Sequence, residues 1–120
     1  DTTVALGRRI LGKPADAAQA TETLAALSGR THRVITAVAV AAGRREWLAV
    51  RTSRVHFDAM PPREIERYVA SGEPFGKAGA YAIQSAVAAW IARIEGSYSG
   101  IMGLPLFETA QLLRQAGVRF

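Results

Sequence analysis

Hydrophobic and polar residues alternate most regularly in two stretches near the middle of the chain. From Thr31 to Ala41, every second side chain, beginning with His32, falls on one face, and the residues between them fall on the other. Such alternation is typical of a half-buried strand. A second stretch, Trp47–Phe57, is rich in β-branched and aromatic residues, and Gly43 lies between the two. The pattern therefore predicts a long β-hairpin.

The N-terminal segment also has the pattern of a hairpin. Thr2–Leu6 is a short apolar run, and Gly7 separates it from Arg8–Leu11. The following Gly12-Lys13-Pro14 ends this pairing, because proline has no N–H to donate to a strand ladder.

Three segments have the pattern of helices. Asp16 is a suitable N-cap for a helix over Ala17–Leu27, with Gln19 at the capping-box position. A second helix begins at Pro61-Pro62, since proline is tolerated in the first turn. The last is expected to start at Pro105 and to turn three side chains inward: Leu106, Ala110 and Leu113.

Two later segments are ambiguous. Ile83–Ile94 fits a helical period, yet its second half also alternates as a strand would. Ser97–Gly103 is interpreted as a short strand or a loop. Taken together, the elements predict an α/β or α+β domain with a mixed sheet flanked by helices.

Composition excludes several classes of protein. The 120 residues are 49% hydrophobic, contain no cysteine and suffice for a single domain with a real core. Disulfide scaffolds, thiolate–zinc sites and thiol nucleophiles are excluded. No apolar run approaches the ~20 residues of a membrane span, and no leader is visible. We therefore expect a cytoplasmic protein that does not bind membranes.

The formal net charge is +5, and 13 of the 15 basic residues are arginine, with Lys13 and Lys77 the exceptions. This balance suits a phosphate-bearing partner. The aromatic-interleaved basic stripe of a nucleic-acid binder is missing, so no nucleic acid is expected as a partner.

No phosphate-binding or nucleophile motif stands out by spacing alone. Three features rise slightly above this background. Asp1 begins a strand, Lys13 lies between glycine and proline, and Lys77 opens a glycine-bearing segment that continues to Tyr81 and Gln84. By themselves, these residues are more typical of ordinary surface positions than of a site.

Seven blocks of sequence, in order and at matching spacing, carry a resemblance that covers essentially the whole chain: Asp1–Val4, Gly12–Pro14, Leu27–Thr36, Tyr68–Pro74, Lys77–Gln84, Gly96–Tyr98 and Gly103–Pro105. They closely resemble the Maf family of nucleoside triphosphate pyrophosphatases, also called septum formation inhibitors. The resemblance implies an extended mixed sheet of the Maf and inosine-triphosphatase type.

The resemblance also implies an activity: hydrolysis of a nucleoside triphosphate to the monophosphate and pyrophosphate with Mg²⁺ or Mn²⁺. Asp1 matches the acidic residue that activates water or holds the metal, and Lys13 matches a phosphate-contacting lysine. Gln84 matches the glutamine of an Ile-Gln block, and Lys77 and Tyr81 belong to the same substrate-binding loop. The 7-methyl-GTP branch of the family has a glutamate where this chain has Gln84. The resemblance of the Lys77–Gln84 block therefore favours the branch acting on dTTP, UTP and modified pyrimidine nucleotides.

The resemblance implies three further properties. It favours a strand over Val87–Ile94 and suggests a homodimer. The family normally begins with a Ser-x-Ser-Pro-Arg-Arg segment that nothing here matches, so residues 1–120 are expected to form one domain that is N-terminally incomplete relative to the family. We expect such a piece to be weakly active or inactive by itself.

Two other functions remain open. One is a non-catalytic module that regulates division or binds RNA, which the net charge would suit. The other is a purine-directed pyrophosphatase of the inosine triphosphate type, which has a similar architecture.

Overall fold

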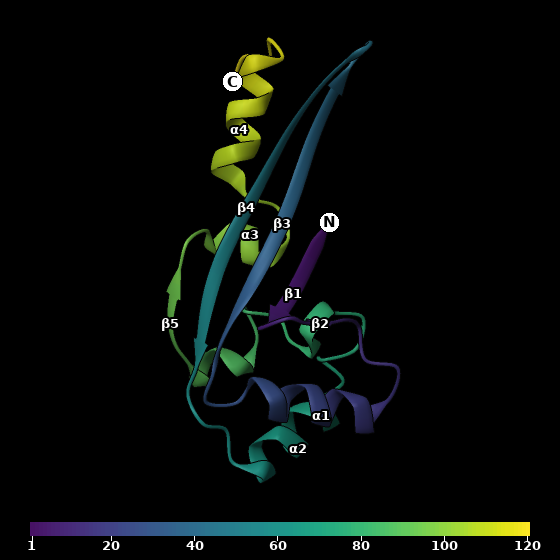
Figure 1. Ribbon diagram of the computed structural model, residues 1–120, viewed down its shortest axis with the longest axis vertical. Coiled ribbons are helices and arrows are strands. Elements are labelled where there is room, and N and C mark those ends of the chain that lie inside the picture. Colours follow the sequence, from purple (N-terminus) through teal and green to yellow (C-terminus); the bar gives the residue numbers. More distant parts are fainter.

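Residues 1–120 are described by a computed structural model, which contains one five-stranded sheet with helices against it (Figure 1). The strand order is β2-β1-β3-β4-β5, and every neighbouring pair is antiparallel. The strands are β1 (Thr2–Leu6), β2 (Arg9–Leu11), β3 (Thr31–Ala42), β4 (Arg45–Phe57) and β5 (Ile91–Glu95). The helices are α1 (Ala17–Leu27), α2 (Pro62–Ala70), α3 (Tyr98–Met102) and α4 (Leu106–Gln115), with 3₁₀ turns η1 (Ala78–Ala80) and η2 (Ala86–Trp90).

The predicted central hairpin is the longest feature of the molecule. β3 and β4 pair without interruption from Thr31 opposite His56 to Ala42 opposite Arg45. Gly43 opens the connecting turn with φ of +62°, a conformation that glycine adopts without steric cost. The strands project well beyond the rest of the sheet, with α4 beside them (Figure 1). The radius of gyration is accordingly 15.9 Å, against roughly 14 Å for a compact domain of this length.

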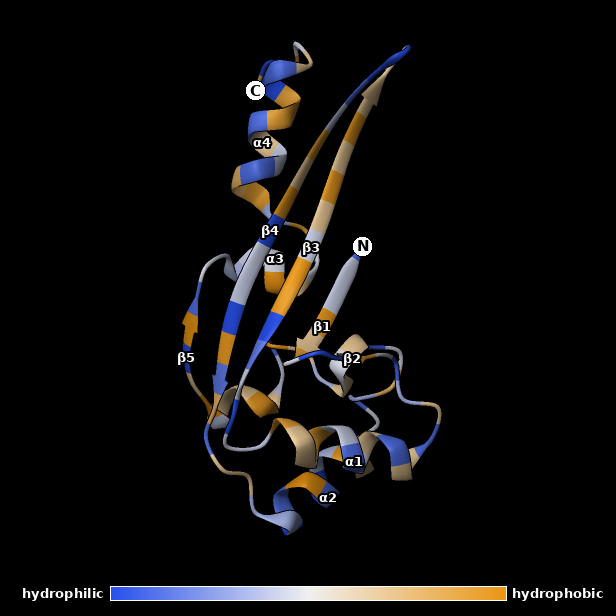
Figure 2. Cartoon of the chain, viewed as in Figure 1, coloured by the Kyte–Doolittle hydropathy of each residue, from blue (hydrophilic) through white to orange (hydrophobic).

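The hydrophobic core lies at the other end of the hairpin. There α1 packs against α2 and η1, η1 contacts β1 and β2, and their buried side chains form one hydrophobic cluster with those of the sheet, among them Val34. Leu24 and Leu27 of α1 are completely buried, as is Val55 of β4. Figure 2 shows the hydrophobic residues of α1 and α2 close to this end of the sheet, whereas the hairpin tip is hydrophilic.

Local sequence signals account for α1. The Asp16 carboxylate accepts a hydrogen bond from the Gln19 N–H (2.8 Å), and the Gln19 side chain accepts one from the Ala15 N–H (2.6 Å). The predicted capping arrangement is confirmed, with the return bond going to the residue before the cap.

The α/β class with flanking helices is confirmed, but four details of the prediction are wrong. The sheet is antiparallel throughout and not mixed, because each pairing joins strands that run in opposite directions. Val87–Ile94 is not one strand: η2 occupies its first half, where the Ser85 hydroxyl accepts from the Val87 N–H, and β5 begins at Ile91. The third and fourth corrections concern the C-terminal helices.

Ser97–Gly103 contains the helix α3 and no strand. The Ser97 hydroxyl caps this helix by accepting from the Gly100 N–H (2.9 Å), and Gly103 ends it with φ of +127°. The last helix follows Pro105 as predicted, but Leu106 is 60% exposed, and Leu112 is its buried residue.

None of the helices combines the length and the apolar character that crossing a lipid bilayer requires.

Candidate functional site

A cavity of about 320 Å³ lies between the start of β1, the segment around η1, and α3. All five residues singled out from the sequence line it: Asp1, Lys13, Lys77, Tyr81 and Gln84. They come from three regions that are distant in the chain, so the fold brings them to one place.

Asp1 extends the ladder between β1 and β3 by one residue. Its nitrogen donates to the Ala37 carbonyl (3.2 Å), and the Ala37 N–H donates to the Asp1 carbonyl (3.0 Å). These two bonds fix the Asp1 backbone, while the residue itself is exposed. A carboxylate is therefore held at the rim of the cavity on a rigid strand.

Lys13 is exposed between β2 and α1 and is anchored by its neighbours. Pro14 is buried, and the Gly12 carbonyl accepts a hydrogen bond from the Gly79 N–H (3.2 Å). Gly79 has φ of +73°, and a Cβ there would lie 2.9 Å from Val4 Cγ1. η1 therefore packs directly on β1, which brings Lys13 and the η1 segment together.

Lys77 and Gln84 flank the buried part of this segment. The Lys77 ammonium donates to the Glu73 carbonyl (3.0 Å), and Gln84 is exposed directly after the buried Ile83. Ala80 between them is buried with φ of +63°. A non-glycine residue in this region costs on the order of 1 kcal/mol or more, so surrounding contacts must hold it.

Tyr81 supplies the main contact of that kind. Its hydroxyl lies 2.6 Å from His32 Nε2, and its ring meets the rings of His32 and Phe57 edge-on. Burial raises the pKa of the Tyr81 hydroxyl, so the group stays protonated. Because the hydroxyl is engaged with His32, the side chain contributes a fixed aromatic wall to the cavity.

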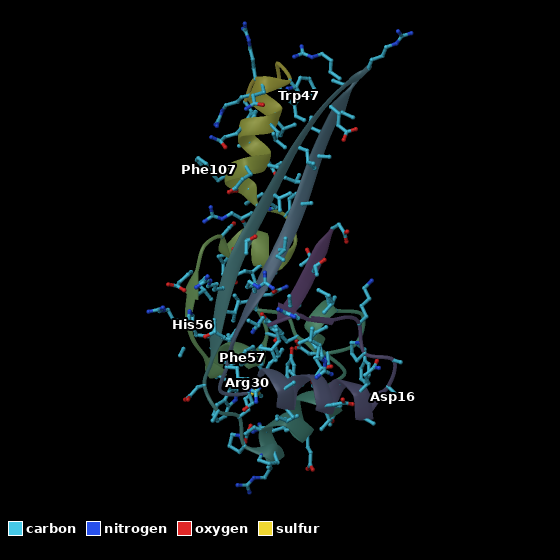
Figure 3. The ribbon with its side chains drawn as sticks, in the orientation of Figure 1. Asp16, Arg30, Trp47, His56, Phe57 and Phe107 are labelled. Carbon is cyan, nitrogen blue, oxygen red and sulfur yellow. The ribbon has the colours of Figure 1, made fainter.

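His32 is 1% exposed, and its Nδ1 has no hydrogen-bond partner. Burial, with a smaller electrostatic contribution from His56, lowers the pKa of His32 to about 4. The imidazole is therefore neutral near pH 7, and it stacks on Phe57 at a centroid distance of 5.4 Å. Phe57 and His56 are both labelled at the base of the hairpin in Figure 3.

Sequence reasoning missed the α3 wall of the cavity. Ile101 and Met102 line it, as does Thr2 of β1. The signal for α3 was present in the serine three residues before Gly100 and in Gly103, a cap and a stop for a very short helix. A lining that combines apolar side chains with charged groups suits a ligand with an uncharged ring and an anionic tail.

Asp1 is the one carboxylate among the residues that line the cavity, and no three His, Cys, Asp or Glu side chains gather anywhere in the chain as a metal site would need. The donor set therefore does not fit a metal caged by protein alone. It does fit a divalent cation shared with a ligand's phosphates, since Mg²⁺ in such sites takes one or two carboxylates and completes its shell with phosphate and water.

The chain resembles named enzymes over nearly its full length. It is 66% identical over 119 residues to a dTTP/UTP pyrophosphatase of a Polaromonas species and 65% identical over 120 residues to one of Cupriavidus pinatubonensis. These matches cover 99% and 100% of this chain but 59% and 60% of the two relatives. The chain thus spans about 60% of the length of the curated relatives it matches.

A match to the family described as Maf-like protein covers residues 1–116. It includes all of the secondary structure and all the residues that line the cavity. The resemblance carried by the seven sequence blocks is confirmed, and this chain belongs to the Maf-like protein family.

Proposed function

We propose that this chain carries the nucleotide-binding and catalytic pocket of a nucleoside triphosphate pyrophosphatase acting on dTTP, UTP and modified pyrimidine nucleotides. The observation that supports this most is the convergence of Asp1, Lys13, Lys77 and Gln84 on one cavity. The printed activity of the relatives, dTTP/UTP pyrophosphatase, agrees in substrate class.

In the proposed reaction, a water oxygen attacks the α-phosphorus, and the bond from that phosphorus to the oxygen bridging to the β-phosphorus breaks. The nucleoside monophosphate and pyrophosphate leave, and the proton of the attacking water passes to the Asp1 carboxylate or to solvent. Lys13 and Lys77 place two positive charges against the triphosphate, which lowers the energy of the charge that develops on the leaving pyrophosphate. Gln84 offers both an amide donor and a carbonyl acceptor to the nucleotide.

A Mg²⁺ or Mn²⁺ ion bound with the triphosphate would neutralise phosphate charge and polarise the reacting oxygen atoms. Asp1 is the residue that would hold it. The lysines then need to balance only the remaining negative charge of the substrate.

The proposed base-binding region is the apolar part of the cavity lining, which includes Tyr81, Ile83 and Ile101. A pyrimidine is a flat, uncharged ring that such walls accept by burial and by contact with an aromatic face. The proposal further includes a homodimer and action in the cytoplasm, where nucleoside triphosphates are abundant.

A pyrophosphate-release assay with dTTP and Mg²⁺ tests the proposal, run on this chain and on the Polaromonas relative. Asp1→Asn and Lys13→Ala, made in both proteins at the matching positions, should each lower kcat at least tenfold, since each removes a charge from the reacting groups. Arg8→Ala is the matched control, because Arg8 is an exposed cation outside the cavity. Its turnover should stay within about twofold of the unsubstituted protein, as for most surface changes.

Retained turnover in both variants would contradict the proposed mechanism. We further propose that this chain alone turns over more slowly than the longer relative, and equal rates would overturn that point. A panel containing dTTP, UTP, ITP and 7-methyl-GTP decides the base: a preference for ITP would replace the pyrimidine proposal with the purine-directed alternative.

A further inference from the structure

The turn that carries Gln84 is not part of any helix or strand. Between η1 and η2, residues 81–85 make one backbone hydrogen bond among themselves, from the Ser85 N–H to the Ala82 carbonyl (3.1 Å). Ile83 and Gln84 lie between these two residues, and both line the cavity. Because no ladder of backbone bonds holds this Ala82–Ser85 turn, its position depends on side chains that bond to it.

Tyr68 of α2 supplies such a side chain. Its hydroxyl accepts a hydrogen bond from the Ala82 N–H (3.3 Å) and lies 2.8 Å from the Ser85 hydroxyl. The Ser85 hydroxyl also donates to the Ala82 carbonyl at 2.6 Å. The first and last residues of the turn are therefore joined to each other and to Tyr68, with Gln84 between them.

Tyr68 itself has a well-packed position. It is 6% exposed and shares the buried side of α2 with Ile65 and Val69, and all three belong to the hydrophobic core. Burial raises the pKa of the Tyr68 hydroxyl, so the group keeps its proton and can donate as well as accept. The turn is thus attached to a helix that packs in the core.

Tyr68 is not among the residues that line the candidate site. It lines a different cavity, of about 430 Å³, whose other lining residues include Glu73 and Trp90. Any effect of Tyr68 on a ligand in the candidate site must therefore pass through the Ala82–Ser85 turn.

Loss of the Tyr68 hydroxyl would leave the turn without its attachment. Ala82 is buried, and its N–H makes no other hydrogen bond. A buried donor that loses its acceptor is unfavourable, so the turn would move to reach water or another acceptor. Gln84 would move with it.

We propose that Tyr68 is a positioning residue of the nucleotide site, which acts by fixing the Ala82–Ser85 turn and, through it, Gln84. The inference rests on the proposed function, because it requires that Gln84 contact the nucleotide. Hydrogen bonds of a side-chain amide weaken steeply when their distances and angles change, so a displaced turn weakens the contact without removing the amide.

The first test uses this chain without nucleotide and asks whether the turn is held. Tyr68→Phe removes the hydroxyl and keeps the ring. In hydrogen exchange followed by NMR, the Ala82 amide should exchange at least about tenfold faster in the variant, because it has lost its acceptor. The amide of Leu24 in α1 reports overall stability and should accelerate by a smaller factor. An Ala82 factor no larger than that of Leu24 would overturn the positioning role, whatever the activity of the protein.

The second test measures binding of a dTTP analogue with an imido bridge between the α- and β-phosphorus, by calorimetry with Mn²⁺. Gln84→Ala should weaken binding about tenfold, and Tyr68→Phe about three- to fivefold, within the range expected for one lost or weakened hydrogen bond. The double variant should bind within about twofold of Gln84→Ala alone, since Tyr68 then has no amide left to position. Residues that act independently would instead show the product of the two losses.

Two further variants complete this test. Ser85→Ala removes the other hydroxyl that holds the turn, and it should weaken binding about as much as Tyr68→Phe does. Tyr98→Phe is the matched control, because Tyr98 is 48% exposed and lies outside the cavity lining. Its affinity should stay within about twofold of that of the unsubstituted chain.

The outcomes separate the positioning role from the proposed function. Losses that multiply in the double variant would refute the role of Tyr68 and leave the proposed function intact, as would full binding by both Tyr68→Phe and Ser85→Ala. Full binding by Gln84→Ala would refute the contact assigned to Gln84 and, with it, the role of Tyr68. No binding by the unsubstituted chain would refute the proposed function and the positioning role together.

Discussion

The two ends of the central hairpin share one sequence pattern but differ in what surrounds them. At its base, β3 places His32, Val34 and Thr36 in the core, each at most 2% exposed. Toward the tip the same alternation continues, yet no residue of β3 beyond Thr36 is buried. Figure 3 shows Trp47 near the tip and far from Phe57 at the base. Alternation thus predicts a strand, whereas burial depends on which other elements reach it.

This difference in burial also means that the two ends of the hairpin have different roles. The base carries the cavity, the aromatic group of His32, Phe57 and Tyr81, and the η1 segment. The tip is held by the ladder between β3 and β4 and by α4, whose buried residue is Leu112. We therefore expect stability and site geometry to depend on the base and to be insensitive to most changes at the tip.

The largest expected effect comes from a matched pair of leucines. Leu24 in α1 is 0% exposed, and Leu48 near the tip is 63% exposed. Leu24→Ala should lower the free energy of unfolding by about 2–5 kcal/mol, because it removes buried surface and leaves a cavity. Leu48→Ala should change it by no more than about 0.5 kcal/mol. Urea unfolding followed by circular dichroism measures both, and a similar cost for the two would show that the tip is packed as tightly as the base.

The next largest effect is a dependence of folding stability on pH, which comes from a buried titratable group at the base of the hairpin. His32 is buried at the base with a pKa lowered from 6.5 to about 4. As the pH falls below 6.5, His32 is protonated in the unfolded chain but stays neutral in the folded chain, so the free energy of unfolding decreases. The loss continues until about pH 4, where the folded form also protonates, and it amounts to about 3 kcal/mol.

Urea unfolding between pH 4 and pH 7 measures this loss, with His32→Gln as the comparison. Glutamine can still bond to the Tyr81 hydroxyl but has no proton to gain, so the variant should show a flatter dependence on pH. Trp90 in η2 and Trp47 near the tip provide separate fluorescence signals when the other is replaced by phenylalanine. A pH dependence as steep in His32→Gln as in the unsubstituted chain would assign the loss to other groups.

The sequence predicted the fold where local physics is sufficient. The alternation over Thr31–Ala41 and the cap at Asp16 both specify their structures through neighbouring residues. Val87–Ile94 misled because alternation over a few residues does not distinguish a strand from a 3₁₀ turn followed by a strand. α3 was missed because a helix of five residues has no full apolar stripe to detect.

The site divides in the same way. Matching blocks of sequence identified the five residues that the structure brings to one cavity. Blocks cannot show that the Tyr81 hydroxyl faces His32, because the two residues are 49 positions apart and meet only through the fold. The hydrogen bond from the Thr36 hydroxyl to the Gly100 carbonyl likewise depends on a contact between β3 and α3. Long-range hydrogen bonds are what the sequence pattern leaves out.

The smallest expected effect compares two glycines that share a backbone conformation. Gly79 at the base has φ of +73° and Gly43 at the tip has φ of +62°. Alanine at either position incurs the backbone cost of about 1 kcal/mol. At Gly43 the new Cβ meets nothing within 4 Å, whereas at Gly79 it would lie 2.9 Å from Val4 Cγ1. Gly79→Ala should therefore cost about 1–2 kcal/mol more than Gly43→Ala, since overpacking adds to the backbone cost.

A double substitution isolates the steric part of this difference. Val4→Ala removes the methyl groups that the new Cβ would strike, so the effects of Gly79→Ala and Val4→Ala should be less than additive in urea unfolding. Gly43 lies at the tip of the hairpin, whereas Val4 lies on β1 near its base. The effects of Gly43→Ala and Val4→Ala on the free energy of unfolding should therefore add within about 0.5 kcal/mol. If Gly79→Ala and Gly43→Ala lower the free energy of unfolding equally, β1 adjusts to the added Cβ at position 79 without an energetic cost. The close packing that holds Lys13 beside the η1 segment would then not be what fixes the cavity.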